Sequence, residues 1–86
     1  MKSLEIIFRE NPKKKTIRIS DFDIWHQRGS MIITNRKDKS NIHISSVRLS
    51  EMNTSNWFDC MKFNGYYKEP GKGYFPIEIK IALNIH

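Results

Sequence analysis

The sequence predicts a mainly β fold, a small antiparallel meander of five or six strands that is curled into a barrel or packed as a sandwich. Two observations carry this prediction. The C-terminal segment alternates apolar and polar residues with a period of two, and other segments repeat the pattern less regularly. The connections between these segments are short and rich in turn-forming residues, as hairpin loops are. At most one short helix or turn is expected, near residues 50–60.

The chain is long enough for one domain, residues 1–86. Hydrophobic residues make up 38% of it, with five Phe, three Tyr and two Trp, so a compact core can be buried and disorder is not expected. The single cysteine, Cys60, cannot form an internal disulfide, which fits a reducing compartment. No apolar run is long enough for a signal peptide or a membrane span, so we expect a cytoplasmic protein without membrane contact.

The first strands are expected within residues 2–10 and 16–25. Both segments alternate, but the second one changes phase at Ser20 and Asp21. Such a change indicates a bulge or a bend, because the inward-facing side chains must return to the same face of the sheet. The residues expected to face the core are Leu4, Ile6, Phe8, Ile17, Ile19, Phe22 and Ile24.

The central segments are a short apolar run at residues 30–35 and an alternating segment at residues 41–49. The second segment again switches phase, from Ile42 and Ile44 to Val47 and Leu49. Residues 50–63 are ambiguous. Cap-like serines and threonine, with Trp57 and Met61 four residues apart, favour a short helix or an irregular turn, whereas a continued strand would place Trp57, Met61 and Phe63 on one face.

The C-terminal half contains two competing turns and the most regular strand. Asn64-Gly65 and Pro70-Gly71 are both hairpin signals, and they place the tyrosines between them differently. From residue 75 to residue 85, apolar side chains occupy every odd position, which predicts a strand with one buried face. Pro76 lacks an N–H group, so the strand is expected to start there, to bulge, or to lie at an edge.

The net charge of +6 is unevenly distributed. Residues 1–48 contain eleven Lys and Arg against five Asp and Glu, whereas residues 49–86 contain four of each kind. This asymmetry attracts anionic partners. If the turns at residues 11–15 and 35–40 lie at the same end of the sheet, the basic residues there form one patch able to contact phosphates. These residues are Lys13, Lys14, Lys15, Arg18, Arg36, Lys37 and Lys39. Alternatively, the lysines only keep turns and strand edges soluble.

Segment 63–75, FNGYYKEPGKGYF, interleaves tyrosines and lysines across a glycine-rich loop. The residues expected to bind a partner are Tyr66, Tyr67, Lys68, Lys72 and Tyr74. Aromatic faces beside cations can stack on unpaired bases. Tyrosines equally provide a large contact area for recognising a protein. The structural alternative is that the tyrosines pack across strands and only stabilise the sheet.

A third group, Asp21, Asp23 and His26, lies in the segment DFDIWH. The two carboxylates share one side of a strand, and His26 or His43 would have to complete a cation site. The spacing of known zinc sites is absent, so we assign no metal and no cofactor. The carboxylates are more simply explained by contacts with solvent or with nearby lysines.

No catalytic motif is present. Cys60 would need a neighbouring base, and only His26, His43 and His86 are available, without a local motif that joins them. The segment PGKGY lacks the spacing and the following helix of a phosphate-binding loop. We therefore expect a non-enzymatic protein.

Two hypotheses on function remain. The first is a small recognition protein that binds another protein as an inhibitor, an immunity-type protein or an accessory subunit. The second is a small β-barrel that binds nucleic acid through the basic turns and the tyrosines. The first is favoured because the lysines and the aromatic residues lie in different halves of the sequence. An exposed strand edge would also allow a homo-oligomer.

Overall fold

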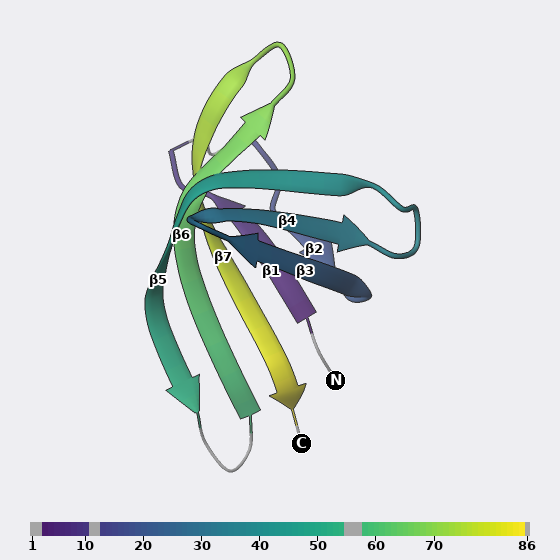
Figure 1. Cartoon of the computed structure of the whole chain (residues 1–86), viewed down its shortest axis with the longest axis vertical. Coiled ribbons are helices and arrows are strands. Elements are labelled where there is room, and N and C mark those ends of the chain that lie inside the picture. The colour runs from purple at the N-terminus through teal and green to yellow at the C-terminus, as the bar shows by residue number, and fades with distance from the viewer. Residues whose placement is uncertain (1–2, 11–12, 55–57, 86) are drawn as a thin grey trace.

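The computed structural model describes residues 3–10, 13–54 and 58–85, and within them every helix or strand element is a β-strand (Figure 1). All pairings are antiparallel. The strands are β1 (Ser3–Phe8), β2 (Ile17–Ile19), β3 (Phe22–Gln27), β4 (Ser30–Asn35), β5 (Asn41–Thr54), β6 (Phe58–Glu69) and β7 (Gly73–Ile85). The mainly β prediction is confirmed. The described sheet has seven strands, more than expected, because segment 16–25 divides into two strands. The described part of the ambiguous region forms no separate strand and instead extends β5 and β6.

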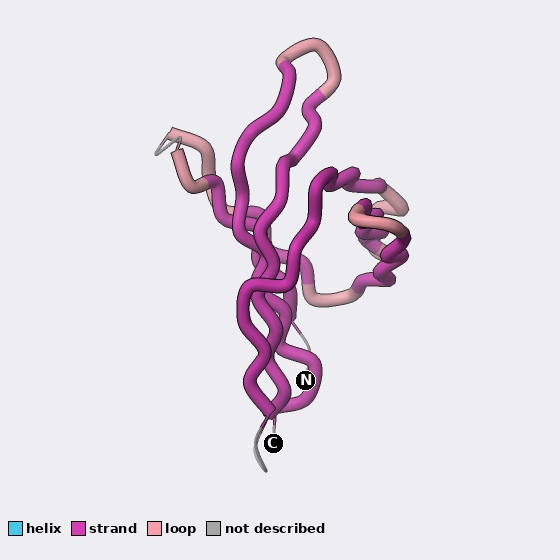
Figure 2. The backbone as a smooth tube through the Cα atoms, turned by 60° about the vertical axis from the view of Figure 1, so that its left-hand side comes forward, coloured by secondary structure: helices cyan, strands magenta, loops and turns pink. Residues whose placement is uncertain are grey.

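The seven strands form one sheet in the order β2-β1-β7-β6-β5-β4-β3. Strands β3 to β7 follow one another as a meander, and the N-terminal hairpin β1–β2 joins the far side of β7. The two edge strands, β2 and β3, are nevertheless neighbours in the sequence, separated only by Ser20 and Asp21. The sheet must therefore curl until its edges approach, which gives the half-barrel seen in Figure 2.

The corner at Ser20 and Asp21 confirms the predicted change of phase. Ile19 ends β2 as a buried residue, and Phe22 starts β3 as a buried residue. The two intervening residues turn the chain from one edge of the sheet to the other. The inward pattern resumes with the opposite parity because the chain has changed edge.

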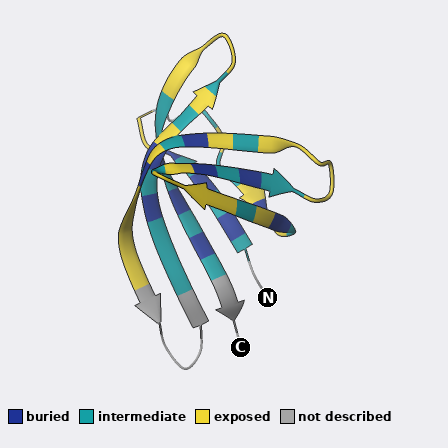
Figure 3. Cartoon of the chain, viewed as in Figure 1, coloured by how far each residue is buried: buried dark blue, intermediate teal, exposed yellow. Residues whose placement is uncertain are grey.

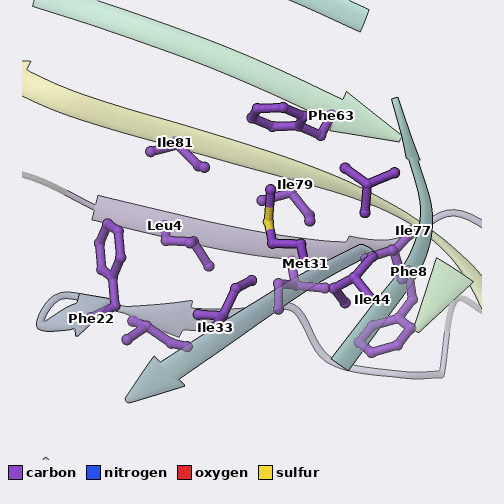
Figure 4. Close-up of a cluster of buried hydrophobic side chains, with 13 residues drawn as sticks. Leu4, Phe8, Phe22, Met31, Ile33, Ile44, Phe63, Ile77, Ile79 and Ile81 are labelled. Carbon is purple, nitrogen blue, oxygen red and sulfur yellow. The ribbon is translucent and has the colours of Figure 1, made fainter. Parts of the chain in front are cut away.

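The core lies inside the curl and is entirely apolar among the described residues (Figure 4). Its centre is made by β1 and β7, where Ile6 pairs with Ile79 and both side chains are fully buried. Each such isoleucine contributes about 1.5–3 kcal/mol through the area it removes from water. The predicted inward residues Ile77, Ile79 and Ile81 of β7 are buried, and Phe75 packs against them half-buried. The side chains of Leu83 and Ile85 lie outside the described residues.

Strand β5 is bent by a bulge, which explains its second change of phase. Its register with β6 shifts between Ser45 and Arg48, and Ser46 takes a positive φ of 52°. The Val47 N–H donates to the Gly29 carbonyl oxygen of the β3–β4 turn at 2.7 Å. Val47 is buried as predicted, whereas the side chain of Leu49 remains 49% exposed, because β4 does not extend along this half of β5.

The Asn64-Gly65 pair is not a hairpin turn, so that alternative is wrong. Both residues lie within β6, and the chain reverses at Pro70–Lys72. Gly65 faces the β5 bulge, where a Cβ atom would lie 2.8 Å from Ile44 Cγ2 and 3.1 Å from the Ser45 carbonyl oxygen. A glycine is required here because two backbones approach closely.

The remaining sequence alternatives are also decided by the strand bounds. β5 continues to Thr54 and β6 begins at Phe58, so the described part of segment 50–63 contains no helix. Residues 55–57, with Trp57 among them, lie outside the described residues. Pro76 lies inside β7. The pairing of β7 with β1 ends at Ile77, which is the partner of Phe8, so from Pro76 to the turn only β6 is paired with β7. This agrees with the edge position expected for a proline.

Candidate partner-binding surface

The tip of the β6–β7 hairpin projects beyond the rest of the sheet (Figures 1 and 2). In its register Tyr66 pairs with Pro76, and Lys68 pairs with Tyr74. Because alternate residues of a strand share a face, these four side chains lie on the outer face of the sheet, the face that points away from the core. Tyr66 is 46% exposed and Tyr74 is 58% exposed. Exposed residues also dominate the tip in Figure 3.

Tyr67 belongs to the opposite, inner face. Its ring meets the Phe8 ring edge-on, with 5.5 Å between the centroids, and Phe75, which pairs with Tyr67 across β6 and β7, meets Phe8 at 6.3 Å. The five residues predicted to bind a partner therefore divide. Tyr66, Lys68 and Tyr74 share the outer face, whereas Tyr67 packs against the core as a cross-strand aromatic residue. The fifth residue, Lys72, is exposed in the turn between β6 and β7, where its Nζ atom lies 3.7 Å from Glu69 Oε1.

A shallow groove lies between the two exposed tyrosines and the β5 bulge. It is lined by Ser45, Ser46, Tyr66 and Tyr74. The groove exists because the bulge displaces the β5 backbone beside Tyr66, where the Ser45 hydroxyl donates to the Tyr66 carbonyl oxygen at 3.4 Å. We call this surface, Ser45, Ser46, Tyr66 and Tyr74, the tyrosine groove.

A second hollow adjoins the tyrosine groove and shares Ser46 and Tyr66 with it. It has a volume of about 480 Å³, and its polar lining includes Arg9, Arg48 and Asn64. Gly65, Pro76 and Ile77 also line it. We call it the arginine hollow.

The strands place the two arginines on either side of Asn64. Arg48 follows the β5 bulge and pairs with Asn64 in the sheet. Arg9 follows β1, where its N–H donates to the Pro76 carbonyl oxygen at 3.1 Å. Its guanidinium Nη1 donates to Asn64 Oδ1 at 3.1 Å. Within the described part of the chain, neither arginine forms an ion pair with a carboxylate.

The three adjacent lysines of the predicted basic patch have different surroundings. Lys13 and Lys15 are exposed, whereas the Lys14 ammonium lies 2.7 Å from Glu69 Oε2 and 4.5 Å from the centre of the Phe75 ring. The hydrogen bond from Lys14 lowers the pKa of the Glu69 carboxyl below its ordinary value, and the charges of Lys14 and Lys72 add to this. Lys14 thus connects the loop between β1 and β2 to the β6–β7 hairpin.

Arg36 occupies a similar structural position at the other basic turn. Its guanidinium binds Asp23 through Nε at 2.9 Å and through Nη2, and Nη1 lies 3.4 Å from Asp21. The hydrogen bond and charge of Asp23 raise the pKa of Arg36. The carboxylates of the segment DFDIWH therefore bind an arginine of the β4–β5 turn. The sequence had predicted contacts with solvent or with nearby lysines.

The basic turns lie at opposite ends of β1, so the predicted residues do not form one patch. Lys14 contacts Phe8 at one end of β1. Arg36 contacts Asp21, which follows the end of β2. β2 ends at Ile19, and Ile19 pairs with Leu4 near the other end of β1. Lys37 and Lys39 are exposed in the β4–β5 turn. Arg18 is exposed on β2 and lies 3.8 Å from Glu5.

The titratable residues considered for metal binding or catalysis are dispersed. The His26 ring packs edge-on against Phe63 at 6.1 Å, His43 is exposed, and Cys60 is half-buried on β6. Within residues 3–10, 13–54 and 58–85, no three His, Cys, Asp or Glu side chains are grouped to hold a metal ion. His86 lies outside the described residues.

One edge of the sheet carries an exposed aromatic residue. β3 borders the curl and presents Trp25, which is 67% exposed and donates through Nε1 to Gln27 Oε1 at 3.3 Å. This edge is the part of the fold where another strand would pair. Among the described residues, no helix is both long and apolar enough to cross a membrane.

In comparisons with known proteins, no family model, curated protein or solved structure matches the chain. Sequence reasoning found Tyr66 and Tyr74 but missed Arg9 and Arg48. Each arginine is isolated in the sequence, and only the pairing of β5 and β7 with β6, together with the end of β1, brings them beside Tyr66.

Proposed function

We propose that this protein acts by recognising another protein, without catalysis, as an inhibitor, an immunity-type protein or an accessory subunit. The observation that carries the proposal is the continuity of the tyrosine groove with the arginine hollow. Together they present two exposed tyrosines and two arginines without carboxylate partners on one continuous surface of the described residues. Tyr and Arg are the residue types that most often carry the binding energy of protein interfaces.

The distribution of charge favours a protein partner over a nucleic acid. Binding a single strand requires a groove in which many cations follow the backbone. On the outer face of this sheet, some cations lie beside carboxylates: Lys62 lies 3.3 Å from Glu51, and Arg18 lies 3.8 Å from Glu5. Lys14 and Arg36 are ion-paired, and the exposed lysines are divided between two distant turns.

Nucleic-acid binding is the second candidate, and one observation favours it. Arg9 and Arg48 belong to the basic half of the sequence, yet they line the same hollow as Tyr66. The separation of basic and aromatic residues in the sequence, which favoured a protein partner, therefore does not persist in space. A stacked base with an adjacent phosphate would also fit such a combination.

The test is affinity capture by the immobilised protein from nuclease-treated lysate of the source organism, followed by reconstitution with the purified partner. The wild type is compared with Tyr66→Ser and Tyr74→Ser. We expect each substitution to weaken binding by more than about 1 kcal/mol while the unfolding free energy stays nearly unchanged, because both rings face solvent. Thr34→Ala, on the outer face of β4, is the matched control and should bind as the wild type does.

Binding to generic single-stranded RNA or DNA is measured in parallel over a range of salt concentrations. Association with nucleic acid that weakens steeply with salt, together with capture of protein from untreated lysate but of none from nuclease-treated lysate, would reject the protein-recognition proposal and favour the second candidate.

A further inference from the structure

We infer that the arginine hollow is a carboxylate-binding site, which receives an acidic side chain or a chain-terminal carboxylate of the partner. The inference rests on the proposed function and names the chemistry that the partner presents. It starts from the hydrogen-bonding groups in the hollow, most of which are donors. Arg9 uses one guanidinium N–H on Asn64 Oδ1 and retains others, and Arg48 retains all of its donors in the described structure.

Asn64 contributes to the same preference for an acceptor. Its Oδ1 atom is occupied by Arg9, so the group that it offers to a ligand is its NH2 donor. The hollow therefore presents two guanidinium groups and an amide NH2 group. An ionised carboxylate is an acceptor-only group whose two oxygens match the parallel N–H groups of arginine.

The net charge around the hollow favours a carboxylate over a phosphate. Glu78 pairs with Asn64 on the outer face of the sheet, with an expected Cβ–Cβ distance of about 4.5–5.5 Å. Two arginines and this glutamate give a net charge of one positive unit. A singly charged carboxylate leaves this group of charges neutral, whereas a phosphate with a charge of about −1.5 to −2 leaves it negative beside Glu78.

The hollow is also preorganised. The Arg9 backbone N–H is hydrogen-bonded to the Pro76 carbonyl oxygen, and the Arg9 side chain is held by Asn64. Tyr66 forms one side of the hollow and continues into the tyrosine groove. A partner segment can thus place its carboxylate between the two arginines, while the residues next to that carboxylate contact Tyr66 and Tyr74.

The experiment is a titration of the isotopically labelled full chain, followed in amide and arginine side-chain NMR spectra. The probes are N-acetylglycine for a terminal carboxylate, N-acetylaspartate amide for a side-chain carboxylate, and inorganic phosphate; N-acetylglycine amide is the uncharged control. We expect saturable shifts at Gly65, Ser46 and the Nε–H groups of Arg9 and Arg48 with at least one carboxylate. The carboxylate that binds more tightly identifies the source.

Substitutions locate the site. Arg9→Gln or Arg48→Gln should weaken carboxylate binding about tenfold, the loss expected for one charged hydrogen bond. Glu78→Gln should strengthen it. Lys80→Gln changes the net charge equally on the same strand but lies outside the hollow, and it should change binding less than about twofold.

Three results would overturn the inference: no saturable shift with either carboxylate, phosphate binding more tightly than both, or an equal loss with Lys80→Gln and Arg48→Gln. A preserved pattern of dispersed amide signals shows that each variant is folded. This experiment needs no partner, so it can fail while tyrosine-dependent capture succeeds. Conversely, carboxylates can bind while no protein is captured, which would reject the proposed function alone.

Discussion

At the scale of single residues, similar sequence patterns have different roles in the fold. Of the three adjacent lysines, Lys14 packs against two aromatic rings and a carboxylate while Lys13 and Lys15 are exposed. Of the two adjacent tyrosines, Tyr66 faces solvent and Tyr67 faces Phe8. Period-two alternation could have predicted the second difference. The first could not be predicted, because it depends on contact with a strand that lies far away in the sequence.

Gly65 in β6 should be difficult to replace. Its φ lies outside the left-handed region, so the requirement is space: a Cβ would lie 2.8 Å from Ile44 Cγ2. We expect Gly65→Ala to lower the unfolding free energy by about 1–3 kcal/mol, as overpacking does in other cores. Asn64→Ala, whose side chain points outward, is the control for urea denaturation. Equal stabilities of the two variants would contradict the close approach of β5 and β6.

The contact between Lys14 and Glu69 should make stability depend on pH. The folded-state pKa of Glu69 is lowered, so the contact contributes stability above the ordinary carboxyl pKa of 4.5, and this stability is lost as the pH falls through the folded-state pKa. We expect Glu69→Gln to melt below the wild type at pH 7, and the difference to shrink below pH 4.5. Lys14→Ala should destabilise more than Lys15→Ala. A difference in melting temperature that is independent of pH would contradict this prediction.

At the scale of elements, alternation predicted the strands, and long-range pairing determined what they do. The C-terminal strand and both changes of phase could be found in the sequence because side-chain period and burial are local properties. The sequence left open whether the chain turns at Asn64-Gly65. The hairpin preference of this pair is overridden by the contact of Gly65 with the β5 bulge. The arginine hollow required the register of several strands and could not be predicted from local patterns.

The buried face of β7 should dominate stability. Ile79 is fully buried between β1 and β6, so Ile79→Ala should lower the unfolding free energy by about 2–5 kcal/mol, and Ile79→Asp should prevent folding. Ile7→Ala on the outer face of β1 is the control and should cost less. Thermal and urea denaturation measure both. A circular dichroism spectrum dominated by helix would contradict the fold itself.

At the scale of the whole molecule, the positive charge is spread over separate ends of a curled sheet. Lys13 and Lys15 lie beside the loop that follows β1, whereas Lys37 and Lys39 lie in the β4–β5 turn. Such separated charges produce a general attraction for anionic surfaces and supply few specific contacts, since lysine lacks the planar fork of arginine.

Replacing both Lys13 and Lys15 with Gln should therefore affect how fast the partner is found. We expect the association rate to fall about twofold to tenfold at low salt, while the dissociation rate of the complex remains nearly constant. Stopped-flow or surface-binding kinetics with the captured partner provide the measurement. Loss of the complex at physiological salt would show that the two lysines are contact residues.

The pairing of β1 with β7 determines when the chain can fold. Ser3 pairs with Ala82, so β1 must wait for a strand that is synthesised much later. Until residue 82 has left the ribosome, the apolar residues Leu4 and Ile6 have no β7 partner, and a nascent chain would expose them. Contacts between residues so distant in sequence slow folding. We therefore expect the sheet to close only after β7 has been synthesised, with chaperones binding the hairpin of β1 and β2 in the interval.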